Sequence, residues 1–174
     1  MTGKEFLNAV AKGQSDILQL LLDILAETAS SYCVIGGLAV NAYVEPVVSL
    51  DLDIVVATAD LDSTSSTAEG RRLKVVQFEH RVNISSHLSD LRIQLQTDPR
   101  YQHFIPGAVL KELLGYGMKV ARLEDVLQGK VWAYMDQTRR KSKRQKDLAD
   151  ILRIVEAYPK LATLLPPNLQ QELE

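Results

Sequence analysis

The segment Tyr32–Val56, with the sequence YCVIGGLAVNAYVEPVVSLDLDIVV, decides the fold of this chain. It begins with the apolar run 32–35 and ends with the apolar run 50–56, and both have the length of β-strands. Between them stand Gly36 and Gly37, a short apolar stretch of helical character, and a proline that ends it. The pattern predicts a strand, a tight turn, a short helix, a loop and a second strand. Because the second run is apolar on both sides, we expect it to be a central strand of an α/β sheet.

The second run also contains two acidic residues, Asp51 and Asp53. Residues two apart in a strand point to the same side, so both carboxylates face one way while Leu52 and Ile54 face the other. Two like charges on one strand face repel each other, and a divalent cation is a common remedy. Oxygen ligands of this kind suit Mg²⁺. The pattern indicates a metal site, although two surface carboxylates at a strand end would give the same sequence.

The Gly36-Gly37 turn lies between the first strand and the helix, where backbone N–H groups can contact a phosphate. Glycines also simply make turns, so the pair is a weak signal by itself. Thirteen residues separate Gly37 from Asp51. The glycine pair and the two carboxylates at this spacing form a more specific signal than either part alone.

Outside this segment the chain alternates helical and strand patterns. Ser15 can cap a first helix at 16–28, whose apolar residues recur at helical spacing. The sequence LRIQLQ of Leu91–Gln96 alternates apolar and polar residues, as a strand with one buried face does. The remaining predictions are helices near 65–71, 107–114, 123–135 and 145–158, and strands at 72–78, 82–85 and 116–121. We expect residues 1–174 to form a single domain with a C-terminal helical extension.

Composition limits the function. Of the 174 residues 46% are hydrophobic, which is enough for a core, and the net charge of −2 argues against nucleic-acid binding by overall charge. Cys33 is the only cysteine, so no internal disulfide forms and we expect a reducing compartment. The N-terminus lacks the apolar region of a signal peptide, and no apolar run has the length of a membrane span. The expected location is the cytoplasm.

One segment is strongly basic: Arg139–Lys146, with the sequence RRKSKRQK. A solvated charged loop is its default interpretation. The alternative is a patch that contacts the phosphates of a nucleotide or of RNA. The three histidines, His80, His87 and His103, are scattered without ligand spacing, which argues against a zinc site.

The pattern of a hydrophobic residue, Gly-Gly, a short spacer and Asp-hydrophobic-Asp resembles the signature of the nucleotidyltransferase superfamily. Further segments extend the resemblance from about residue 32 to residue 152. They are similar to segments of the bacterial abortive-infection (AbiEii-type) toxin nucleotidyltransferases and their small relatives. These segments are Leu91–Leu95, Leu123–Leu127 with Lys130 and Ala133, and Arg144 with Lys146-Asp147 and Asp150-Ile151.

The resemblance implies an α/β (α+β) fold, in which a nucleotidyltransferase-like mixed β-sheet is flanked by helices. It implies that Gly36, Gly37 and Ser49 contact the triphosphate of an NTP. It also implies that Asp51 and Asp53 bind one or two Mg²⁺ (or Mn²⁺) ions. Such ions bridge phosphates and neutralise the charge that develops during nucleotide transfer.

Lys130 and Asp147 match positions that AbiEii-type members use in their active sites. By this resemblance Lys130 would pair with a phosphate, and Asp147 would orient Lys130 or assist the acceptor. The alternative interpretation is an ion pair that ties two helices together.

Two positions depart from the superfamily pattern. Gln94 stands where the third carboxylate is expected, and a neutral amide is a poor base and a poor metal ligand. Val47 stands where relatives often have an arginine. Two function classes follow. One is Mg²⁺-dependent transfer of a nucleotide from an NTP to an RNA or protein acceptor. The other is a catalytically impaired protein that binds a nucleotide or a partner, such as the antitoxin of a toxin–antitoxin pair.

Overall fold

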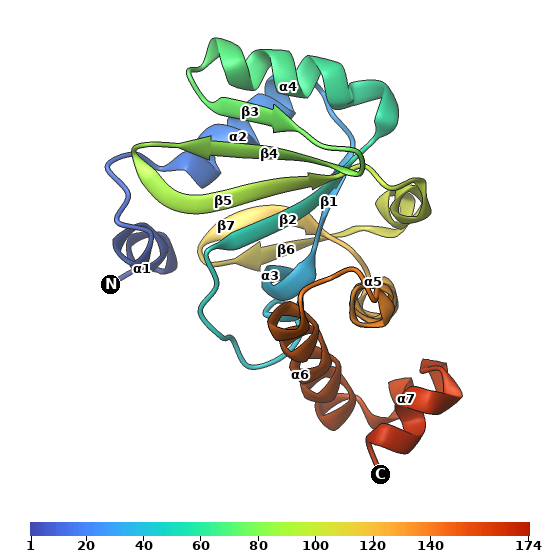
Figure 1. Cartoon of the computed structure of the whole chain (residues 1–174). Helices are drawn as coiled ribbons and strands as arrows, with labels where there is room; N and C mark the ends of the chain where they lie inside the picture. The colour runs from blue at the N-terminus through green and yellow to red at the C-terminus, as the bar shows by residue number, and fades with distance from the viewer.

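The computed structural model describes residues 1–174 and contains one seven-stranded mixed β-sheet with helices around it (Figure 1). The strands are β1 (Tyr32–Ile35), β2 (Asp51–Val56), β3 (Lys74–Gln77), β4 (Arg81–Ser86), β5 (Ser89–Gln96), β6 (Val109–Leu113) and β7 (Tyr116–Val120). Their order in the sheet is β3-β4-β5-β2-β1-β7-β6. The predicted class, a mixed sheet flanked by helices, is confirmed.

Strand β2 lies near the middle of the sheet, antiparallel to β1 and parallel to β5. The strands predicted at 32–35, 50–56 and 91–96 are therefore all present and are neighbours in the sheet, and the expected central position of the second is confirmed. Leu52, Ile54 and Val55 of β2 are buried, whereas Asp51 and Asp53 are only partly buried. Leu52 and Ile54 thus turn into the core, while Asp51 and Asp53 lie on the other face, which is more open at their end of the strand and is buried farther along at Val55.

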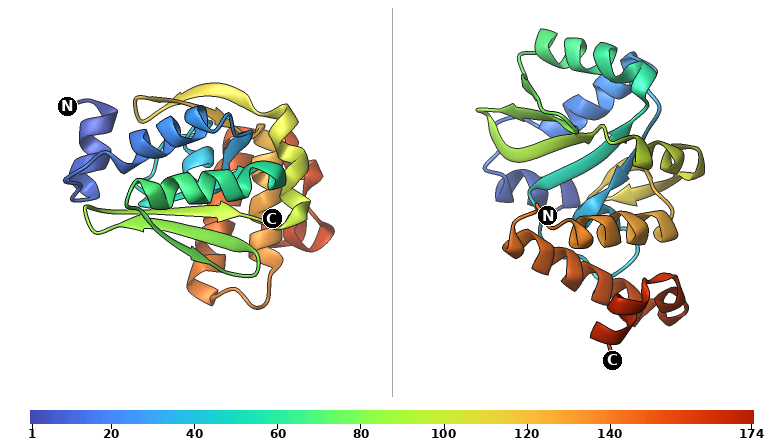
Figure 2. Two further views of the ribbon diagram at one scale, coloured as in Figure 1. Left: turned by 90° about the horizontal axis from the view of Figure 1, so that it is seen from above. Right: turned by 45° about the vertical axis from the view of Figure 1, so that its right-hand side comes forward.

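The helices are α1 (Gly3–Val10), α2 (Ile17–Glu27), α3 (Gly36–Val40), α4 (Leu61–Gly70), α5 (Leu123–Met135), α6 (Lys141–Ala157) and α7 (Pro167–Glu172). Short 3-10 segments are η1 (Thr58–Asp60), η2 (Pro99–Gly107) and η3 (Pro159–Leu164). Helices α2 and α4 lie together, α4 beside β3 and α2 beside β5, and α5, α6 and α7 lie on the opposite side of the molecule (Figure 2). None of these helices combines the length and apolar character needed to cross a bilayer. The helices predicted at 16–28, 65–71, 123–135 and 145–158 are all present, most with shifted ends.

The prediction of a helix near 107–114 is wrong. Residues Val109–Leu113 form β6, which pairs antiparallel with β7. A two-residue turn joins the strands, and its residues Leu114 and Gly115 both have positive φ, 54° and 80°. Positive φ at both central positions is typical of a type I′ hairpin, whose twist matches that of the flanking strands. Pairing with β7, and not the local pattern, therefore decides the structure of this segment.

Two helix starts also differ from the prediction. Asp16, not Ser15, caps α2, because its Oδ1 accepts a hydrogen bond of 3.0 Å from the Gln19 N–H. Most of the basic segment Arg139–Lys146 lies in α6, which begins at Lys141, so its default interpretation as a loop is wrong. Lysine and arginine lose little rotamer freedom in a helix, so a basic run is compatible with a helical start.

The core is one continuous cluster of apolar side chains that extends from Leu7 of α1 to Leu169 of α7. Leu18 and Leu21 of α2 are fully buried in it. Cys33 of β1 lies in the same cluster, and burial raises the pKa of its thiol to about 12. A thiol with so high a pKa is not a nucleophile at neutral pH, so Cys33 has a packing role.

Candidate active site

The turn between β1 and α3 brings Gly36 against Asp53. Gly36 has a φ of +73°, a conformation that residues with a side chain rarely adopt. A Cβ atom at this position would lie 2.4 Å from Asp53 Oδ2. Ile35, the residue before it, is paired with Asp53 across the β1–β2 ladder. The site therefore needs a glycine here for two reasons, the backbone angle and the close approach of the carboxylate.

Asp51 is held by two cationic side chains. Arg92 Nε donates a hydrogen bond of 2.6 Å to Asp51 Oδ1, and Lys143 Nζ lies 3.6 Å from Oδ2. The parallel register of β2 and β5 places Arg92 beside Asp51. Burial by itself would raise the pKa of Asp51, but Arg92 and then Lys143 outweigh burial and hold that pKa below its ordinary value. Asp51 is therefore ionised at neutral pH and already has counter-charges from the chain.

Asp53 has the opposite surroundings. Burial raises the pKa of its carboxyl to about 6, although the charge of Lys130 opposes the shift, and no hydrogen bond contributes. Gln94 of β5 is paired in register with Asp53, so the two side chains share one face of the sheet. The position of the expected third carboxylate is thus on the correct face, with a neutral amide in place of an acid. A partly buried carboxylate without a bonded partner is a position where an added cation would be stabilising.

Lys130 ties α5 to α6. Lys130 is buried, with only 8% of the residue exposed. Its Nζ lies 3.1 Å from Asp147 Oδ1 and 2.8 Å from Asp150 Oδ2. Arg139 Nε donates a hydrogen bond of 2.7 Å to Asp147 Oδ2. Burial would lower the pKa of Lys130, but Asp150 and Asp147 outweigh it and raise that pKa above its ordinary value. The ion pair between two helices that the sequence allowed is present, and its lysine stays charged.

Four further charged side chains border these residues but were not assigned to the site individually by the sequence analysis: Arg139, Lys143, Asp150 and Arg153. Arg139 and Lys143 belong to the basic segment whose alternative interpretation was a phosphate-contacting patch. Three of the four and Asp147 occupy positions 143, 147, 150 and 153, which lie on one face of a helix. Arg153 also fixes the loop before β2, because it donates to Asn41 Oδ1 at 3.1 Å and to the Glu45 carbonyl. The helical spacing was a usable signal, but the interpretation of the basic segment as a loop concealed it.

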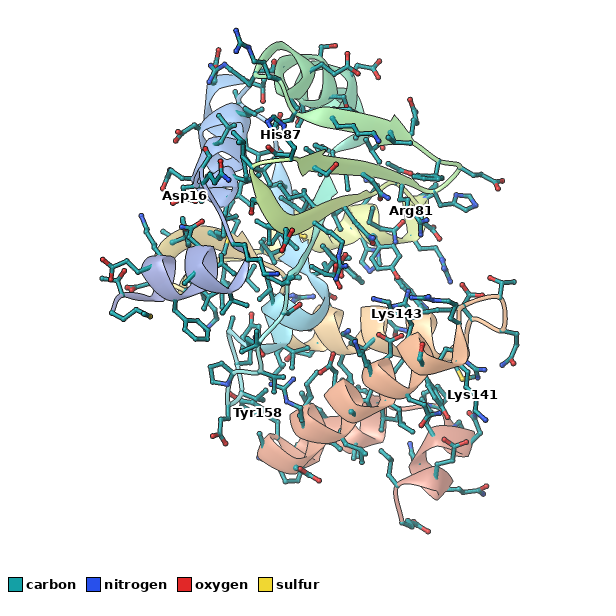
Figure 3. The ribbon with its side chains drawn as sticks, turned by 60° about the vertical axis from the view of Figure 1, so that its left-hand side comes forward. Asp16, Arg81, His87, Lys141, Lys143 and Tyr158 are labelled. Carbon is teal, nitrogen blue, oxygen red and sulfur yellow. The ribbon has the colours of Figure 1, made fainter.

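A cavity of about 510 Å³ lies between β2 and α6. Figure 3 shows Lys143 on the side of α6 that faces the strands. Of the predicted site residues, the cavity is bordered by Gly37, Ser49, Asp51, Asp53, Lys130 and Asp147. Gly36 and Gln94 are not part of its lining, but each adjoins Asp53. The structure therefore brings all the predicted residues into one place.

The cavity lining is rich in charge, with an excess of basic side chains. Six are basic and four are acidic: Arg92, Lys130, Arg139, Lys143, Lys146 and Arg153 against Asp51, Asp53, Asp147 and Asp150. Its apolar part is formed mainly by Val10, Val47, Val48 and Leu50. An excess of positive charge in a concave site favours an anionic ligand.

The residues fit one divalent cation better than two. No group of three or more His, Cys, Asp or Glu side chains is arranged to hold a metal ion. Asp53 offers a carboxylate without a bonded partner, but Asp51 is already bound by Arg92 and Lys143. Gln94 adds no charge. The donor set therefore suits one ion held mainly by Asp53.

Comparison with known proteins finds similar structures but no similar sequences. No protein-family model matches the chain, and no curated protein matches it in sequence. Solved structures do match. The antibiotic-resistance factor ANT(2")-Ia, in complex with adenylyl-2"-tobramycin, has a TM-score of 0.58 and 13% sequence identity, over 90% of this chain and 92% of that chain.

Two further structures match to a similar degree. The lincosamide antibiotic adenylyltransferase LnuA, with lincomycin bound, has a TM-score of 0.55 and 11% identity, over 82% of this chain and 98% of that chain. An antigenic nucleotidyltransferase-like protein from Paracoccidioides brasiliensis has a TM-score of 0.55 and 17% identity, over 90% of both chains. The chain therefore has a nucleotidyltransferase-like fold. The matched structures show the same kind of fold as the one that the resemblance at the Gly-Gly and Asp-Leu-Asp motifs implied.

Proposed function

We propose that the chain is a nucleotidyltransferase that binds an NTP in the cavity between β2 and α6 and transfers the nucleotide to an RNA or protein acceptor. One observation supports this most strongly. Asp51 and Asp53 share a strand face beside the Gly36-Gly37 turn. The cations Lys143, Lys146 and Arg153 of α6 border the same cavity. Carboxylates for a cation and fixed cations for phosphates are the two requirements of phosphoryl-group chemistry.

The phosphate contacts are assigned to the turn and to α5. Gly37 and Ser49 border the cavity and would contact the triphosphate, while Gly36 gives the turn its shape. Lys130 presents a positive charge whose position is fixed by its two carboxylate partners. Asp147 is already bound by Lys130 and Arg139, so its role is to orient these cations. In this role Asp147 is a positioning residue.

Asp53 and Asp51 would hold the divalent cation, Mg²⁺ or Mn²⁺. The bound ion would supply positive charge to the phosphates during transfer. Asp53 is the stronger candidate, because its carboxylate has no partner within the chain and its pKa of about 6 leaves it ionised at neutral pH. We expect weak metal binding in the absence of nucleotide, since only two carboxylates converge.

The acceptor class follows from charge. Two matched structures contain antibiotics, tobramycin as an adenylyl product and lincomycin. Tobramycin is a polycation, and the cavity of this chain has more basic than acidic lining residues. An anionic acceptor such as RNA suits this lining better. The AbiEii-type resemblance at Lys130 and Asp147 supports the same choice and adds a toxin role with an antitoxin partner. We also propose that residues 1–174 act as one domain and that the protein works in the cytoplasm.

A second candidate function is favoured by Gln94. A chain with two carboxylates and an amide on the catalytic face is expected to bind a nucleotide and transfer it slowly or not at all. Such a protein would act by binding a nucleotide or a partner, for example within a toxin–antitoxin pair.

One experiment tests both candidates. The purified chain is incubated with each labelled NTP, Mg²⁺ and bulk RNA, and label on RNA and on protein is followed beside nucleotide binding by calorimetry. We expect binding of at least one NTP and transfer well below about 1 s⁻¹, the low end of ordinary enzyme rates. Binding without any transfer favours the second candidate. Failure of all NTPs to bind, with or without metal, contradicts the first candidate and the nucleotide-binding form of the second.

The amide at Gln94 can be tested directly. Gln94→Asp places a third carboxylate beside Asp53, so we expect Mn²⁺ affinity to rise about tenfold and transfer to become faster. Gln96→Asp is the matched control, because it adds the same charge to the same face of β5, two residues farther along the strand. Equal effects of the two substitutions on Mn²⁺ affinity would show that position 94 is not special.

A further inference from the structure

Arg92 and Lys143 occupy the place where a cation would otherwise neutralise Asp51. They approach from opposite sides of the cavity, Arg92 from β5 and Lys143 from α6. The register of β2 and β5 makes the contact of Arg92 with Asp51 a consequence of strand pairing. The Arg92 side chain is 61% exposed, so it can exchange one anionic partner for another at small cost.

The two cross-strand pairs that contain the carboxylates differ in charge. Asp51 pairs in register with Arg92, a cation, whereas Asp53 pairs with Gln94, a neutral amide. The chain therefore supplies counter-charge to one carboxylate and leaves the other without a bonded partner. Lys146 borders the same cavity and has no acidic partner. Without any metal ion, the cavity already has more positive than negative side chains.

We propose that Arg92 and Lys143 are built-in counter-cations, which let the cavity bind the polyphosphate of a nucleotide without a divalent cation. This inference rests on the proposed function, that the cavity is the NTP site. A polyphosphate is repelled by uncompensated carboxylates, but here Asp51 is compensated before the ligand arrives. The phosphate oxygens then take over hydrogen bonds from the guanidinium of Arg92, which forms bidentate contacts with phosphate. The divalent ion is needed for transfer and not for binding.

The same contact has a second consequence. A divalent ion that enters the site competes with Arg92 and Lys143 for Asp51. Removal of Arg92 therefore changes the affinities for the polyphosphate and for the divalent ion in opposite directions. It weakens the binding of a metal-free polyphosphate and strengthens the binding of a metal ion. A merely structural role for the Arg92–Asp51 pair would not produce effects of opposite sign.

The test is calorimetric titration of the full chain with inorganic triphosphate and with each of the four ribonucleoside NTPs, once in EDTA and once in Mg²⁺. For the wild-type chain we expect at least one of these probes to bind in EDTA within about fivefold of its affinity in Mg²⁺. For Arg92→Ala we expect affinity in EDTA to fall about tenfold, the effect of losing a hydrogen bond to a charged group. Mn²⁺ affinity of the same variant, measured from the spin-resonance signal of free Mn²⁺, should rise severalfold.

Two variants serve as controls. Arg92→Lys keeps the charge and should restore part of the binding in EDTA. Arg71→Ala removes an exposed arginine that is also paired with a carboxylate, Glu27, but away from the cavity, and it should change neither affinity. Circular dichroism verifies that each variant is folded.

The outcomes separate this inference from the proposed function. Binding of NTPs only in Mg²⁺, or unchanged binding of Arg92→Ala in EDTA, would overturn the inference and leave the NTP site in place. Unchanged or weaker Mn²⁺ binding by Arg92→Ala would also overturn it. Failure of every probe to bind in both buffers would overturn the proposed function together with the inference.

Discussion

Gly36 is the residue that allows the turn and the carboxylate to meet. Gly36→Ala puts a side chain at a φ of +73° and a Cβ 2.4 Å from Asp53 Oδ2. We expect the free energy of unfolding to fall by about 2–3 kcal/mol, from the left-handed angle and the displaced carboxylate. Gly37→Ala is the control, since its Cβ would meet only Asp150 Oδ2 at 3.9 Å. Urea denaturation measures both, and equal losses would contradict the assigned role of Gly36.

Asp53 destabilises the folded chain when it is charged. Its pKa in the folded chain is about 6, above the ordinary value of 3.8, so the folded state holds the proton more tightly than the unfolded state. The cost of ionisation is therefore absent below about pH 4, grows as the pH rises, and is complete above about pH 6. At pH 7.5 in EDTA we expect Asp53→Asn to raise the free energy of unfolding by about 1–2 kcal/mol.

Asp51→Asn is the matched control for that substitution. Burial would raise the pKa of Asp51, but Arg92 outweighs burial and lowers that pKa. The charge of Asp51 therefore stabilises the folded chain above the ordinary pKa, and this stabilisation is lost as the pH falls through the lowered pKa. Removal of this charge should leave stability unchanged or lower it slightly at pH 7.5, because Arg92 is largely exposed. Thermal melts of the two variants in EDTA should therefore shift in opposite directions. A stabilising effect of both would show that mutual repulsion, and not burial of Asp53, dominates.

At the scale of single residues, the sequence predicted positions better than partners. The period of two in a strand placed Asp51 and Asp53 on one face, and the resemblance to the superfamily pattern placed Gln94 at the third-carboxylate position beside them. It did not predict that Arg92 bonds to Asp51, because that contact depends on the register of two strands far apart in sequence. A register is fixed by the whole sheet, so no local pattern reports it.

Among the elements, α5 and α6 are joined by ion pairs of one buried lysine as well as by apolar packing. Lys130→Met removes the cation that faces Asp147, which is 1% exposed, and Asp150. We expect a loss of about 3–5 kcal/mol in the free energy of unfolding, the cost of leaving buried carboxylates without a partner. Lys141→Met, at the exposed start of α6, should change it by less than about 0.5 kcal/mol. Guanidinium denaturation measures both, and a loss below about 1 kcal/mol for Lys130→Met would indicate that Arg139 alone satisfies Asp147.

Elements with strong local signals were predicted well, and elements that depend on distant partners were not. The helix Leu123–Met135 was predicted with the bounds that the structure shows. Residues 107–114 were predicted as a helix, but pairing with β7 makes most of them a strand. The basic start of α6 was assigned to a loop by its charge. Lys143 of this start contacts Asp51, and Arg139, just before the helix, contacts Asp147, and the sequence alone does not place Asp51 nearby.

For the whole molecule, the remaining question is whether the sheet and the C-terminal helices unfold together. The core extends without a break from α1 to α7. Strand β1 is hydrogen-bonded to β2 on one side and to β7 on the other, so segments from both halves of the chain alternate in the sheet. The helices α5–α7 follow the last strand, β7, but their buried side chains belong to the same core cluster as those of the sheet, so neither part has a core of its own. We therefore expect one cooperative transition.

Trp132 provides the test. It is the only tryptophan, it lies in α5, and it stacks on Phe104 of η2 at a ring-centroid distance of 5.7 Å, so its fluorescence reports on the helices beside the sheet. Far-UV circular dichroism reports on the whole backbone. In urea we expect the two signals to give the same midpoint and the same slope, because loss of α5 and α6 also exposes the β2 face that holds the carboxylates. Two separated transitions would show that α5–α7 form an independent unit, and the cavity between β2 and α6 would then be an interface between two units that open separately.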